Sequence, residues 1–597
     1  MKRTAKKMIS LLLVGMMTVS MLSGCSSKNN GNGSDSAATK TPETTDNSGN
    51  STEGEAGNNA AAIDTSKVET FTVFLHGSAA SGFNWDNPVA EEITKKTGVK
   101  LQADIALDDP NQKLALMQAS GQYDDIILNV DNSLDTMKGL GTVVKLDDLL
   151  DQYGSNIKSF YGDMLDRIRM EDKERGIYSF GVGAGKAPDI VPGQYWGVGF
   201  NVQNQALKDQ GYPQIKTPED FENVIKTELA KQPLTADGQK RYGLSLITAD
   251  NWRYNFSILQ PANLVNGISL DGDYYLNPET NKVELALQQP YMKEYIRWYN
   301  KMYNEGLIDP ESFTQNYDTY LSKIATGRVI GVIDGYWQFG NANSQLRNNN
   351  QGDLAYMPFT PLTDPANMTW KGDQAGNVAQ SGGFSISTSC KNPAKIVNFF
   401  NYLASEEGQI LTEWGIEGVN YTVDADGNRV RNPEDVKADA KDSSAFMLKT
   451  GVKLYARDYN EWLHQPFGYK TANGQLLSTD ALGNAADAFT QDEKDTLAKY
   501  GYQYFTDAFV SPSKLPIRPY GQLETLSMGS DEDIAVVKKN FDDSKLTNLA
   551  NAIMCKPEEF DGVWDKYMSD LKDMGVDKLV TVMNQSLDTR KELWNVK

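Results

Sequence analysis

The sequence predicts an α/β fold that is divided into more than one globular unit and ends in a helical segment. The chain has 597 residues, of which 40% are hydrophobic. Because single domains usually contain roughly 100–200 residues, this apolar content predicts at least two large cores. Residues 71–130 alternate between strand and helix patterns, whereas apolar residues between 560 and 587 recur only at helical spacing. The first pattern predicts a sheet covered by helices, and the second predicts an amphipathic helix pair packed on the body.

The globular part begins near residue 67 with a doubly wound pattern. Apolar strands of the kind that is buried on both faces of a parallel sheet alternate with helices that begin at proline and end at glycine. The expected elements, in order, are a strand at 71–75, a helix from Pro88 to Gly98, a strand at 99–105, a helix from Pro110 to Gly121 and a strand at 125–130.

A different α/β unit follows. Thr217 is a predicted N-cap with Pro218 at the first helical position, and Phe221 and Ile225 lie on the apolar face of that helix. The remaining expected elements are turns at 236–238, 270–272 and 277–279, a helix at 320–325, strands at 329–333 and 383–386, and a helix that begins at Pro393.

The first 24 residues are predicted to be a secretory signal peptide. Basic residues precede an apolar stretch at 8–22, which is too short for a spanning helix of about 20 residues. The stretch ends at Cys25 in a Leu-Ser-Gly-Cys sequence that resembles the lipobox of bacterial lipoproteins, and this resemblance implies cleavage before Cys25 and lipidation of its thiol. Apart from Ile63, residues 26–66 have no large apolar side chain, which predicts a disordered tether after the lipidated cysteine.

Composition excludes several classes of function. Lysine and arginine number 58 against 79 aspartate and glutamate, and the net charge of −21 disfavours nucleic acid as a partner. Two histidines and three cysteines are too few for a multi-histidine metal cage, a four-cysteine zinc site or a disulfide framework. We therefore expect no metal and no cofactor, and we interpret Cys390 and Cys555 as buried thiols or, alternatively, as one disulfide.

Several segments, taken in order, carry a resemblance to a known family. They lie at residues 97–99, 123–127, 299–310, 327–329, 402–408 and 414–418. Together with the lipobox, this ordered set resembles the family 1 extracellular solute-binding proteins, specifically the long lipoprotein subgroup that serves carbohydrate ABC importers of Gram-positive bacteria. The resemblance implies a two-lobed periplasmic-binding-protein-like fold of type II, in which central sheets flanked by helices form hinged lobes that close on a ligand.

This resemblance also implies a division of the chain. We expect residues 67–190 and 329–383 in the first lobe, 191–328 and 384–520 in the second, and 521–597 as a C-terminal helical segment packed on both. Some relatives carry a calcium loop after the helix that begins at Pro218, but no complete loop is present here. Residues 424–428 are the nearest candidate, and because Arg429 occupies the position that needs glycine, a hairpin turn is the better interpretation.

Candidate ligand-binding residues follow strand ends, because ligands of doubly wound sheets bind beyond the carboxyl ends of the strands. A sugar needs an aromatic plane for its C–H face and carboxylates, amides or guanidinium for its hydroxyls. Each aromatic could instead belong to the core. The candidates are Asn84, Trp85, Asp86, Asn129, Asp131, Trp196, Trp252, Arg253, Asp334, Tyr336 and Trp337, followed by the later residues Trp370, Trp414, Glu417, Tyr459, Trp462 and His464.

The functional expectation is a monomeric binding protein on the extracellular face of the cell membrane. It captures an oligosaccharide, has no catalytic residues, touches the membrane only through its lipid and delivers the ligand to the permease subunits of an ABC importer. One alternative is a secreted glycoside hydrolase with Asp86 and Asp334 as its carboxylate pair. Another is a binding lipoprotein for a non-sugar nutrient such as a peptide.

Overall fold

The structure is a computed structural model that describes most of the chain after residue 62. The described residues are 63–106, 109–130, 133–171, 176–180, 197–248, 251–269, 271–363, 383–455, 462–464, 469–479, 489–510, 520–521, 523–529 and 531–596. The expected signal peptide, Cys25 and most of the tether therefore lie outside the described residues.

The first lobe is built on a five-stranded sheet with the order β2-β1-β3-β11-β4. β1 pairs in parallel with β2 and with β3, which confirms the doubly wound opening, whereas β11 is antiparallel to both β3 and β4. The strands are β1 (Glu69–Leu75), β2 (Val99–Ile105), β3 (Ile126–Leu128), β4 (Ser179–Phe180) and β11 (Phe384–Ile386).

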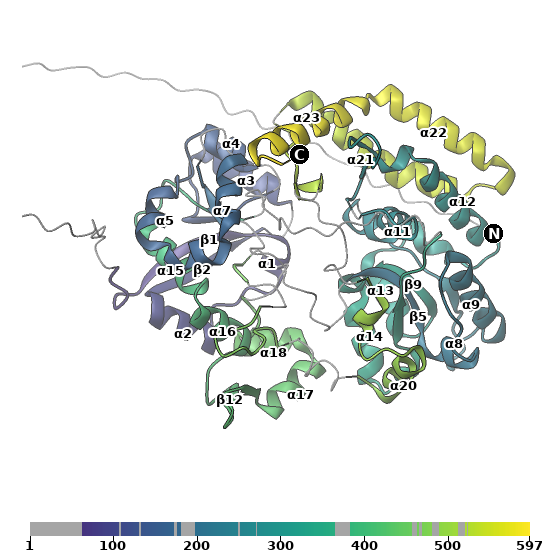
Figure 1. Ribbon diagram of the computed structural model, residues 1–597, viewed down its shortest axis with the longest axis horizontal. Helices are drawn as coiled ribbons and strands as arrows, with labels where there is room; N and C mark the ends of the chain where they lie inside the picture. Colours follow the sequence, from purple (N-terminus) through teal and green to yellow (C-terminus); the bar gives the residue numbers. More distant parts are fainter. Residues whose placement is uncertain are drawn as a thin grey trace, which may run out of the picture. The chain divides into compact units, whose positions relative to one another are not determined.

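Helices cover this sheet, and α15 contacts α2, α5 and α6 (Figure 1). The helix α2 begins at Pro88 with the Asn87 side chain as its cap and ends at Gly98, whose positive φ of 69° suits a residue without a Cβ. The helices are α1 (Gly77–Ser81), α2 (Pro88–Thr97), α3 (Pro110–Ser120), α4 (Ser133–Gly139), α5 (Asp147–Tyr153), α6 (Ser155–Tyr161), α7 (Asp163–Glu171), α15 (Pro393–Leu403), α16 (Glu406–Trp414), α17 (Pro433–Lys441) and α18 (Ser443–Thr450).

A small hairpin joins α16 to α17. It consists of β12 (Tyr421–Val423) and β13 (Arg429–Arg431), and the backbone N–H of Asp424 donates to the carbonyl of Asn428 across the turn. The expected hairpin turn at 424–428 is therefore confirmed.

The second lobe is built on a four-stranded sheet with the order β10-β5-β9-β6. β6 and β9 are parallel, and β5 runs antiparallel to both β9 and β10. The strands are β5 (Val198–Gln203), β6 (Tyr242–Leu244), β9 (Val329–Gly335) and β10 (Tyr356–Phe359), and a separate hairpin pairs β7 (Tyr274–Leu276) with β8 (Val283–Leu285).

Helices α9 and α14 both contact this second sheet (Figure 1). The cap of α9 is a complete capping box, in which Thr217 and Asp220 bond each other's backbone N–H groups; this device stabilises a helix by about 1 kcal/mol. The longer helices are α8 (Asn204–Asp209), α9 (Pro218–Lys231), α11 (Gln260–Val265), α12 (Pro290–Asn304), α13 (Tyr317–Ala325), α14 (Tyr336–Asn348) and α20 (Gln491–Tyr500).

Short helical turns complete the second lobe. They are α10 (Asn251–Tyr254), the π-helix η1 (Asn255–Leu259), and the 3₁₀ turns η2 (Ala286–Gln288), η3 (Pro310–Phe313), η4 (Gly352–Leu354), η7 (Phe505–Ala508) and η9 (Leu523–Thr525).

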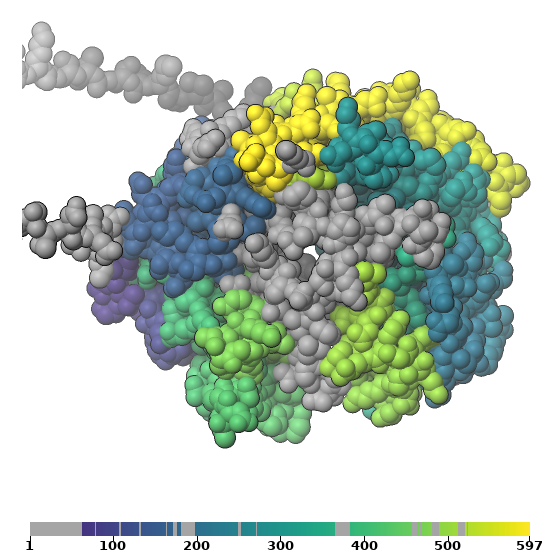
Figure 2. Space-filling model, viewed as in Figure 1, coloured from purple at the N-terminus to yellow at the C-terminus, as the bar shows by residue number. Residues whose placement is uncertain are grey.

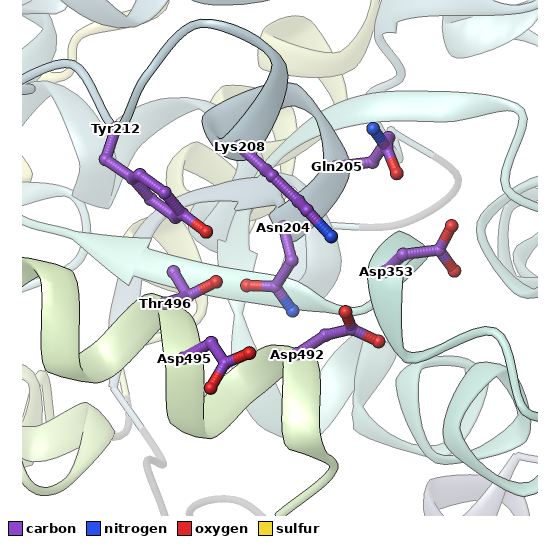
Figure 3. Close-up of a pocket in the computed structure, with 8 residues that line it drawn as sticks. All are labelled: Asn204, Gln205, Lys208, Tyr212, Asp353, Asp492, Asp495 and Thr496. Atoms are coloured by element: carbon purple, nitrogen blue, oxygen red, sulfur yellow. The ribbon is translucent and has the colours of Figure 1, made fainter.

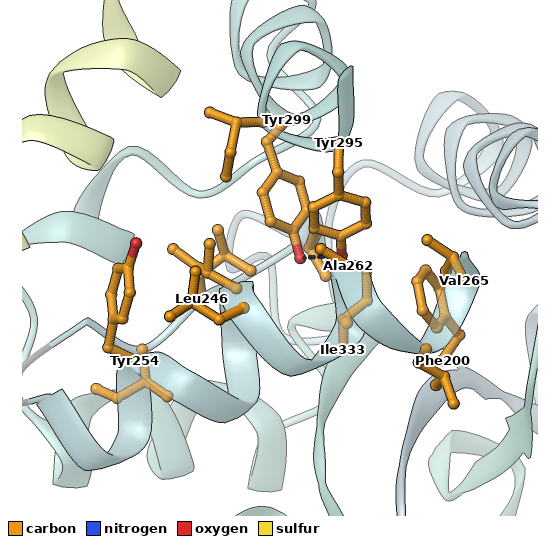
Figure 4. Packing of buried hydrophobic residues seen from close by; sticks show 14 of the residues in the cluster. Phe200, Leu246, Tyr254, Ala262, Val265, Tyr295, Tyr299 and Ile333 are labelled. Atoms are coloured by element: carbon orange, nitrogen blue, oxygen red, sulfur yellow. Dashed lines mark hydrogen bonds between the residues drawn. The ribbon is translucent and has the colours of Figure 1, made fainter. Parts of the chain in front are cut away.

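Tyrosines from α12 lie in the core of the second lobe beside Ile333 of β9 (Figure 4). The hydroxyl of Tyr295 donates to that of Tyr299 at 2.8 Å, and Tyr299 in turn donates to the carbonyl of Ser257 at 2.9 Å. These bonds satisfy the polar atoms that the two large rings bring into the core.

The C-terminal helices pack on the second lobe through α12, and Figure 2 shows them in yellow beside teal residues of that lobe. They are α21 (Glu532–Met554), α22 (Phe560–Met574) and α23 (Asp577–Leu593), with the 3₁₀ turn η10 (Pro557–Glu559) between the first two. Leu579, Met583 and Leu587 of α23 belong to the second core, whereas Trp594, just beyond the helix, belongs to the first. The predicted helix pair is confirmed.

The sheets correct the expected division of the chain. β9 lies in the second sheet beside β5, although residues 329–383 were expected in the first lobe. β11 lies in the first sheet between β3 and β4, although residues 384–520 were expected in the second lobe. An apolar pattern predicts that a strand is buried, but it does not predict which neighbouring strand it pairs with.

Two further observations bear on cysteine chemistry and membrane insertion. Cys390 and Cys555 are free thiols, and burial raises the pKa of Cys390 to about 12.

Within the described ranges, no helix combines the length and the apolar character needed to cross a bilayer.

Candidate functional site

The carboxyl ends of β6 and β9 meet at one edge of the second sheet, because the two strands are parallel. The chain continues from β6 toward α10 and η1, and β9 leads directly into α14. Four of the predicted ligand residues, Trp252, Arg253, Tyr336 and Trp337, follow these strand ends. We therefore take this edge as the candidate site.

Three aromatic rings form a continuous cluster here. The Phe256 ring lies 5.1 Å from the Trp252 ring and 5.0 Å from the Trp337 ring, and both contacts are edge-to-face. Trp252 is 54% exposed, whereas Phe256 and Trp337 are half-buried. The cluster therefore offers aromatic surface that the core does not use.

A π-helical turn sets the position of Phe256. η1 follows α10 without a break, so that Trp252 and Phe256 lie on adjacent turns of one helical segment. Two hydrogen bonds of Ser257 hold this turn in place. Its hydroxyl donates to the Ile247 carbonyl at 3.0 Å, and its backbone carbonyl accepts from the Tyr299 hydroxyl. Single π-turns inside helices often occur at functional sites.

Arg253 brings a cation to the same cluster. Its guanidinium carbon lies 4.1 Å from the centre of the Tyr317 ring and 5.7 Å from that of Trp252. Stacking on an aromatic face holds the planar guanidinium in one orientation. A fixed fork of N–H donors next to exposed aromatic surface suits a ligand that carries both an apolar face and hydroxyl groups.

Asp334 of β9 is fully buried and lies within range of the Arg253 charge. Its carboxylate accepts hydrogen bonds from the hydroxyl of Tyr320 at 2.9 Å, from the side-chain amide of Gln338 at 2.9 Å and from the backbone N–H of Gly335 at 2.7 Å. Burial raises the pKa of Asp334 to about 7, although these hydrogen bonds and the Arg253 charge act in the opposite direction. The expectation that Asp334 contacts a ligand directly is therefore corrected: it is a buried group that positions its neighbours.

Tyr336 also differs from expectation. It is buried in the second core, and its hydroxyl accepts from Asn343 and Arg347, each at 3.4 Å. Tyr336 and Trp337 are adjacent on a helix and therefore face different directions, so that only one of them reaches the cluster.

In the first lobe, Trp85 is a core residue. It is 8% exposed, its indole N–H donates to the Thr94 hydroxyl at 3.1 Å, and its ring packs against Phe83, Phe399 and Tyr455. The prediction that Trp85 offers a face to a ligand is wrong, because Phe83, Phe399 of α15 and Tyr455 pack around the ring.

The neighbours of Trp85 have structural contacts as well. The side-chain amide of Asn84 donates to the Leu448 carbonyl at 2.9 Å, and its oxygen accepts from the backbone N–H of Asp86 at 2.9 Å. Asp86 is exposed. Asn84 thus ties the start of α2 to α18.

The carboxyl ends of β1 and β3 carry His76 and Asn129. The His76 Nε2 atom lies 3.1 Å from the Asn129 carbonyl, and the backbone N–H of Asn129 donates to the Gly383 carbonyl at 2.9 Å. Asn129 is 2% exposed. The first lobe therefore contributes polar groups, but no exposed aromatic ring, at the predicted position among its described residues.

The remaining predicted residues fall into two groups. Trp414, Trp462 and His464 are buried, the Trp414 indole N–H donates to the Leu477 carbonyl at 2.6 Å, and these three residues are structural. Glu417 is exposed on the turn that precedes β12. Asp131, Trp196, Trp370 and Tyr459 lie outside the described residues.

Sequence reasoning missed Phe256 and Tyr317. The spacing of four residues between Trp252 and Phe256 places both on one helical face, and this signal was available in the sequence. Tyr317 begins α13, far from Arg253 along the chain, and no local pattern indicates that the two residues meet.

No group of three or more histidine, cysteine, aspartate and glutamate side chains converges as metal ligands within the described part of the chain.

Comparisons with known proteins agree on one family. A sequence profile described as "Bacterial extracellular solute-binding protein" matches residues 89–442, more than half of the chain. The fructooligosaccharide ABC transporter substrate-binding protein FusA of Streptococcus pneumoniae serotype 4 is 25% identical over 244 residues, which cover 39% of this chain and 44% of FusA. Lipoprotein LipO of Bacillus subtilis is 21% identical over 349 residues, 56% of this chain and 64% of LipO. The matches thus span less than two thirds of either relative.

Solved structures share the fold. An extracellular solute-binding protein from Bifidobacterium longum subsp. infantis has a TM-score of 0.61 at 18% identity, and the alignment covers 89% of this chain and 100% of that one. FusA in complex with kestose has a TM-score of 0.59 at 16% identity, with 88% and 100% covered. The expected two-lobed α/β fold is confirmed.

Proposed function

Because this chain belongs to the family of bacterial extracellular solute-binding proteins, we propose that it captures an oligosaccharide outside the cell and delivers it unaltered to an ABC importer. The name of FusA, a fructooligosaccharide ABC transporter substrate-binding protein, supports the ligand class and the permease partner. The physical support comes from the candidate site itself.

The observation that carries the proposal is the cluster of Trp252, Phe256 and Trp337 beside Arg253. A pyranose or furanose ring has a C–H face that packs on an aromatic plane, and its hydroxyls accept hydrogen bonds from a guanidinium. The guanidinium of Arg253 provides such donors, and its carbon lies 5.7 Å from the centre of the Trp252 ring. One edge of the second sheet thus combines both requirements of a sugar subsite.

The proposed mechanism is closure of the two lobes around the ligand. The second lobe supplies the aromatic cluster, and the first lobe supplies polar groups near Asn129 and His76. A ligand that contacts both lobes stabilises the closed state by the difference between its affinities for the closed and open states. The permease subunits then recognise the closed complex.

We also propose a lipid anchor at Cys25. The lipobox-like sequence before it supports lipidation, and the name of the relative LipO, a lipoprotein, agrees with this. Each buried lipid methylene contributes about 0.8 kcal/mol, so that two or three acyl chains hold a monomeric protein at the outer face of the membrane.

The hydrolase alternative receives no support from the candidate pair. It needs one carboxyl group as a proton donor and the other facing the scissile bond. Asp334 is fully buried and accepts three hydrogen bonds, whereas Asp86 is exposed beside α2. A non-sugar ligand such as a peptide remains an outcome of the experiment below.

The experiment combines calorimetry with product analysis. The purified protein is titrated with fructooligosaccharides, other plant and host oligosaccharides and short peptides, and each mixture is then analysed by chromatography. We expect one oligosaccharide class to bind, to raise the melting temperature and to be recovered intact.

Three results would contradict the proposal. Shorter products would indicate a hydrolase, binding of peptides alone would indicate a different nutrient, and sugar binding that is insensitive to Trp252→Ala and Trp337→Ala together would place the site elsewhere. Tyr123→Ala is the matched control, because Tyr123 is a half-buried aromatic at the amino end of β3.

A further inference from the structure

A small polar cavity lies on the second lobe between α8, η4 and α20 (Figure 3). Its volume of about 10 Å³ corresponds to one water molecule or one bare ion. None of its residues belongs to the candidate sugar site. The lining includes Asn204 and Lys208 from α8, Asp353 from η4, and Asp492, Asp495 and Thr496 from α20.

Asn204 directs an unpartnered oxygen into this cavity. It is 2% exposed, and its side-chain amide donates to the Gly352 carbonyl at 3.0 Å. Because a carbonyl can only accept, the NH₂ group must face Gly352 and the Oδ1 atom must face the other way. That oxygen accepts no hydrogen bond from any described residue. A buried oxygen of this kind needs a ligand, a water molecule or an ion.

Thr496 lines the same cavity, and the residue is 2% exposed. In Figure 3 the hydroxyl of Thr496 and the amide oxygen of Asn204 point toward one another, with Asp495 next to them. Two neutral oxygens thus line the buried end of the cavity.

The cavity carries an excess of negative charge. The carboxylates of Asp353, Asp492 and Asp495 line it together with one ammonium, that of Lys208. Within the described part of the chain, none of these three carboxylates forms an ion pair; Asp495 accepts a hydrogen bond from the Gln491 amide at 2.7 Å. Three carboxylates and one ammonium leave a net charge of −2 around the unpartnered Asn204 oxygen, which favours a cation over a water molecule.

We propose that this cavity is a site for a hard divalent cation of the calcium type. Because no three carboxylates converge as ligands within the described ranges, the ion is held by mixed oxygens: Asn204 Oδ1 and the Thr496 hydroxyl at the buried end, with Asp492 and Asp495 nearer the solvent and water in the remaining positions. Calcium accepts six to eight oxygen ligands of such mixed kinds.

The site joins parts of the chain that are far apart in sequence. α8 follows β5, η4 precedes β10, and α20 comes some 140 residues after η4. A bound ion would therefore connect α20 to α8 and η4, which adjoin strands of the second sheet. The expected consequence is a more stable second lobe in the presence of the ion, independent of any sugar.

The test uses the purified protein after treatment with a chelator. CaCl₂, MgCl₂ and KCl are added at matched ionic strength, and binding is followed by calorimetry and by the melting temperature. We expect one calcium ion per chain and a rise in melting temperature, and we expect Thr496→Val and Asp495→Asn each to lower the affinity tenfold or more. Lys208→Met, which removes the nearby positive charge, should raise the affinity by roughly tenfold.

Asp148→Asn is the matched control, because Asp148 is an exposed carboxylate in the first turn of α5 and should leave calcium binding unchanged. The proposal is overturned if millimolar calcium produces no heat and no thermal shift, which would mean that the cavity holds water only. It is also overturned if Asp495→Asn and Asp148→Asn respond like the unmodified protein, because the ion would then bind elsewhere. Should Thr496→Val fail to fold, as judged by circular dichroism, Lys208→Met still decides the question.

Discussion

The Arg253 guanidinium lies 4.1 Å from the centre of the Tyr317 ring, which joins the first turn of α13 to the helical segment that carries Trp252. A lysine at position 253 keeps the charge but loses the planar fork and its stacking. We predict that Arg253→Lys weakens oligosaccharide binding by about 1–2 kcal/mol, as measured by calorimetry. An affinity equal to that of the unmodified protein would show that the guanidinium does not contact the ligand.

The substitution Trp252→Ala should weaken sugar binding but leave the folding stability nearly unchanged. The Trp252 side chain is 54% exposed, so that Trp252→Ala removes little core packing, and we expect unfolding by urea to change by less than about 1 kcal/mol. The same substitution should weaken sugar binding by roughly 1–3 kcal/mol through the lost aromatic face. Trp337→Ala should weaken binding similarly, with a larger loss of stability because Trp337 is half-buried. Unchanged calorimetric affinity in both variants would refute the placement of the site.

Trp85 should give the opposite result. Because its ring is packed against three aromatic side chains in the first core, Trp85→Ala should destabilise the protein by about 3–5 kcal/mol. Below its lowered unfolding transition, the variant should bind oligosaccharide with nearly normal affinity. A selective loss of affinity with normal stability would restore Trp85 as a ligand residue.

Asp334 should make the free energy of unfolding decrease as the pH rises toward 7. Its pKa is raised from 3.8 to about 7 in the folded protein, so that the folded state holds this proton more tightly than the unfolded state. Its contribution to stability is therefore fully present below about pH 4 and is lost as the pH rises toward 7.

The comparison of interest is between the unmodified protein and Asp334→Asn. Between pH 4.5 and pH 8, the free energy of unfolding of the unmodified protein should fall relative to that of the variant, by on the order of 2–4 kcal/mol. Urea unfolding at the two pH values measures this difference, and Asp148→Asn is an exposed control. A difference that does not vary with pH would mean that Asp334 is ionised throughout.

Trp594 links the two cores. The helix α23 packs on the second core, whereas Trp594, directly after it, packs on the first, with the Arg167 guanidinium 5.0 Å from its ring. We predict that Trp594→Ala costs about 3–5 kcal/mol in urea unfolding, whereas Trp594→Phe retains most of the packing. If both variants unfold like the unmodified protein, the aromatic ring contributes nothing to the joint between the lobes.

Much of the fold could be predicted because its local signals are strong. Pro88 and Gly98 bracket α2, and Thr217 and Pro218 begin α9, since caps of this kind depend only on neighbouring residues. The assignment of β9 and β11 to lobes was wrong, because strand pairing is a long-range property. A strand that is apolar on both faces packs equally well in either sheet.

The candidate site could be predicted only in part, for a related reason. Trp252, Arg253 and Trp337 were predicted as ligand residues because they follow strand ends in the sequence, and the structure brings them to one cluster; their contact with a ligand stays a prediction. Trp85 was misassigned because its ring is covered by Phe399 and Tyr455, which are distant in sequence and leave no local signal. Phe256 and Tyr317 were missed because their roles depend on a π-turn and on a contact with a distant helix.

The position of β11 between β3 and β4 has a consequence for export. A chain that crosses a membrane with its N-terminus first delivers β3 long before residue 386, and until then the backbone groups along one side of β3 have no strand to pair with. An open strand edge can recruit other extended chains. The first sheet can therefore be completed only after the second-lobe strands β5 to β10 have emerged, so that β3 keeps an unpaired edge throughout that interval.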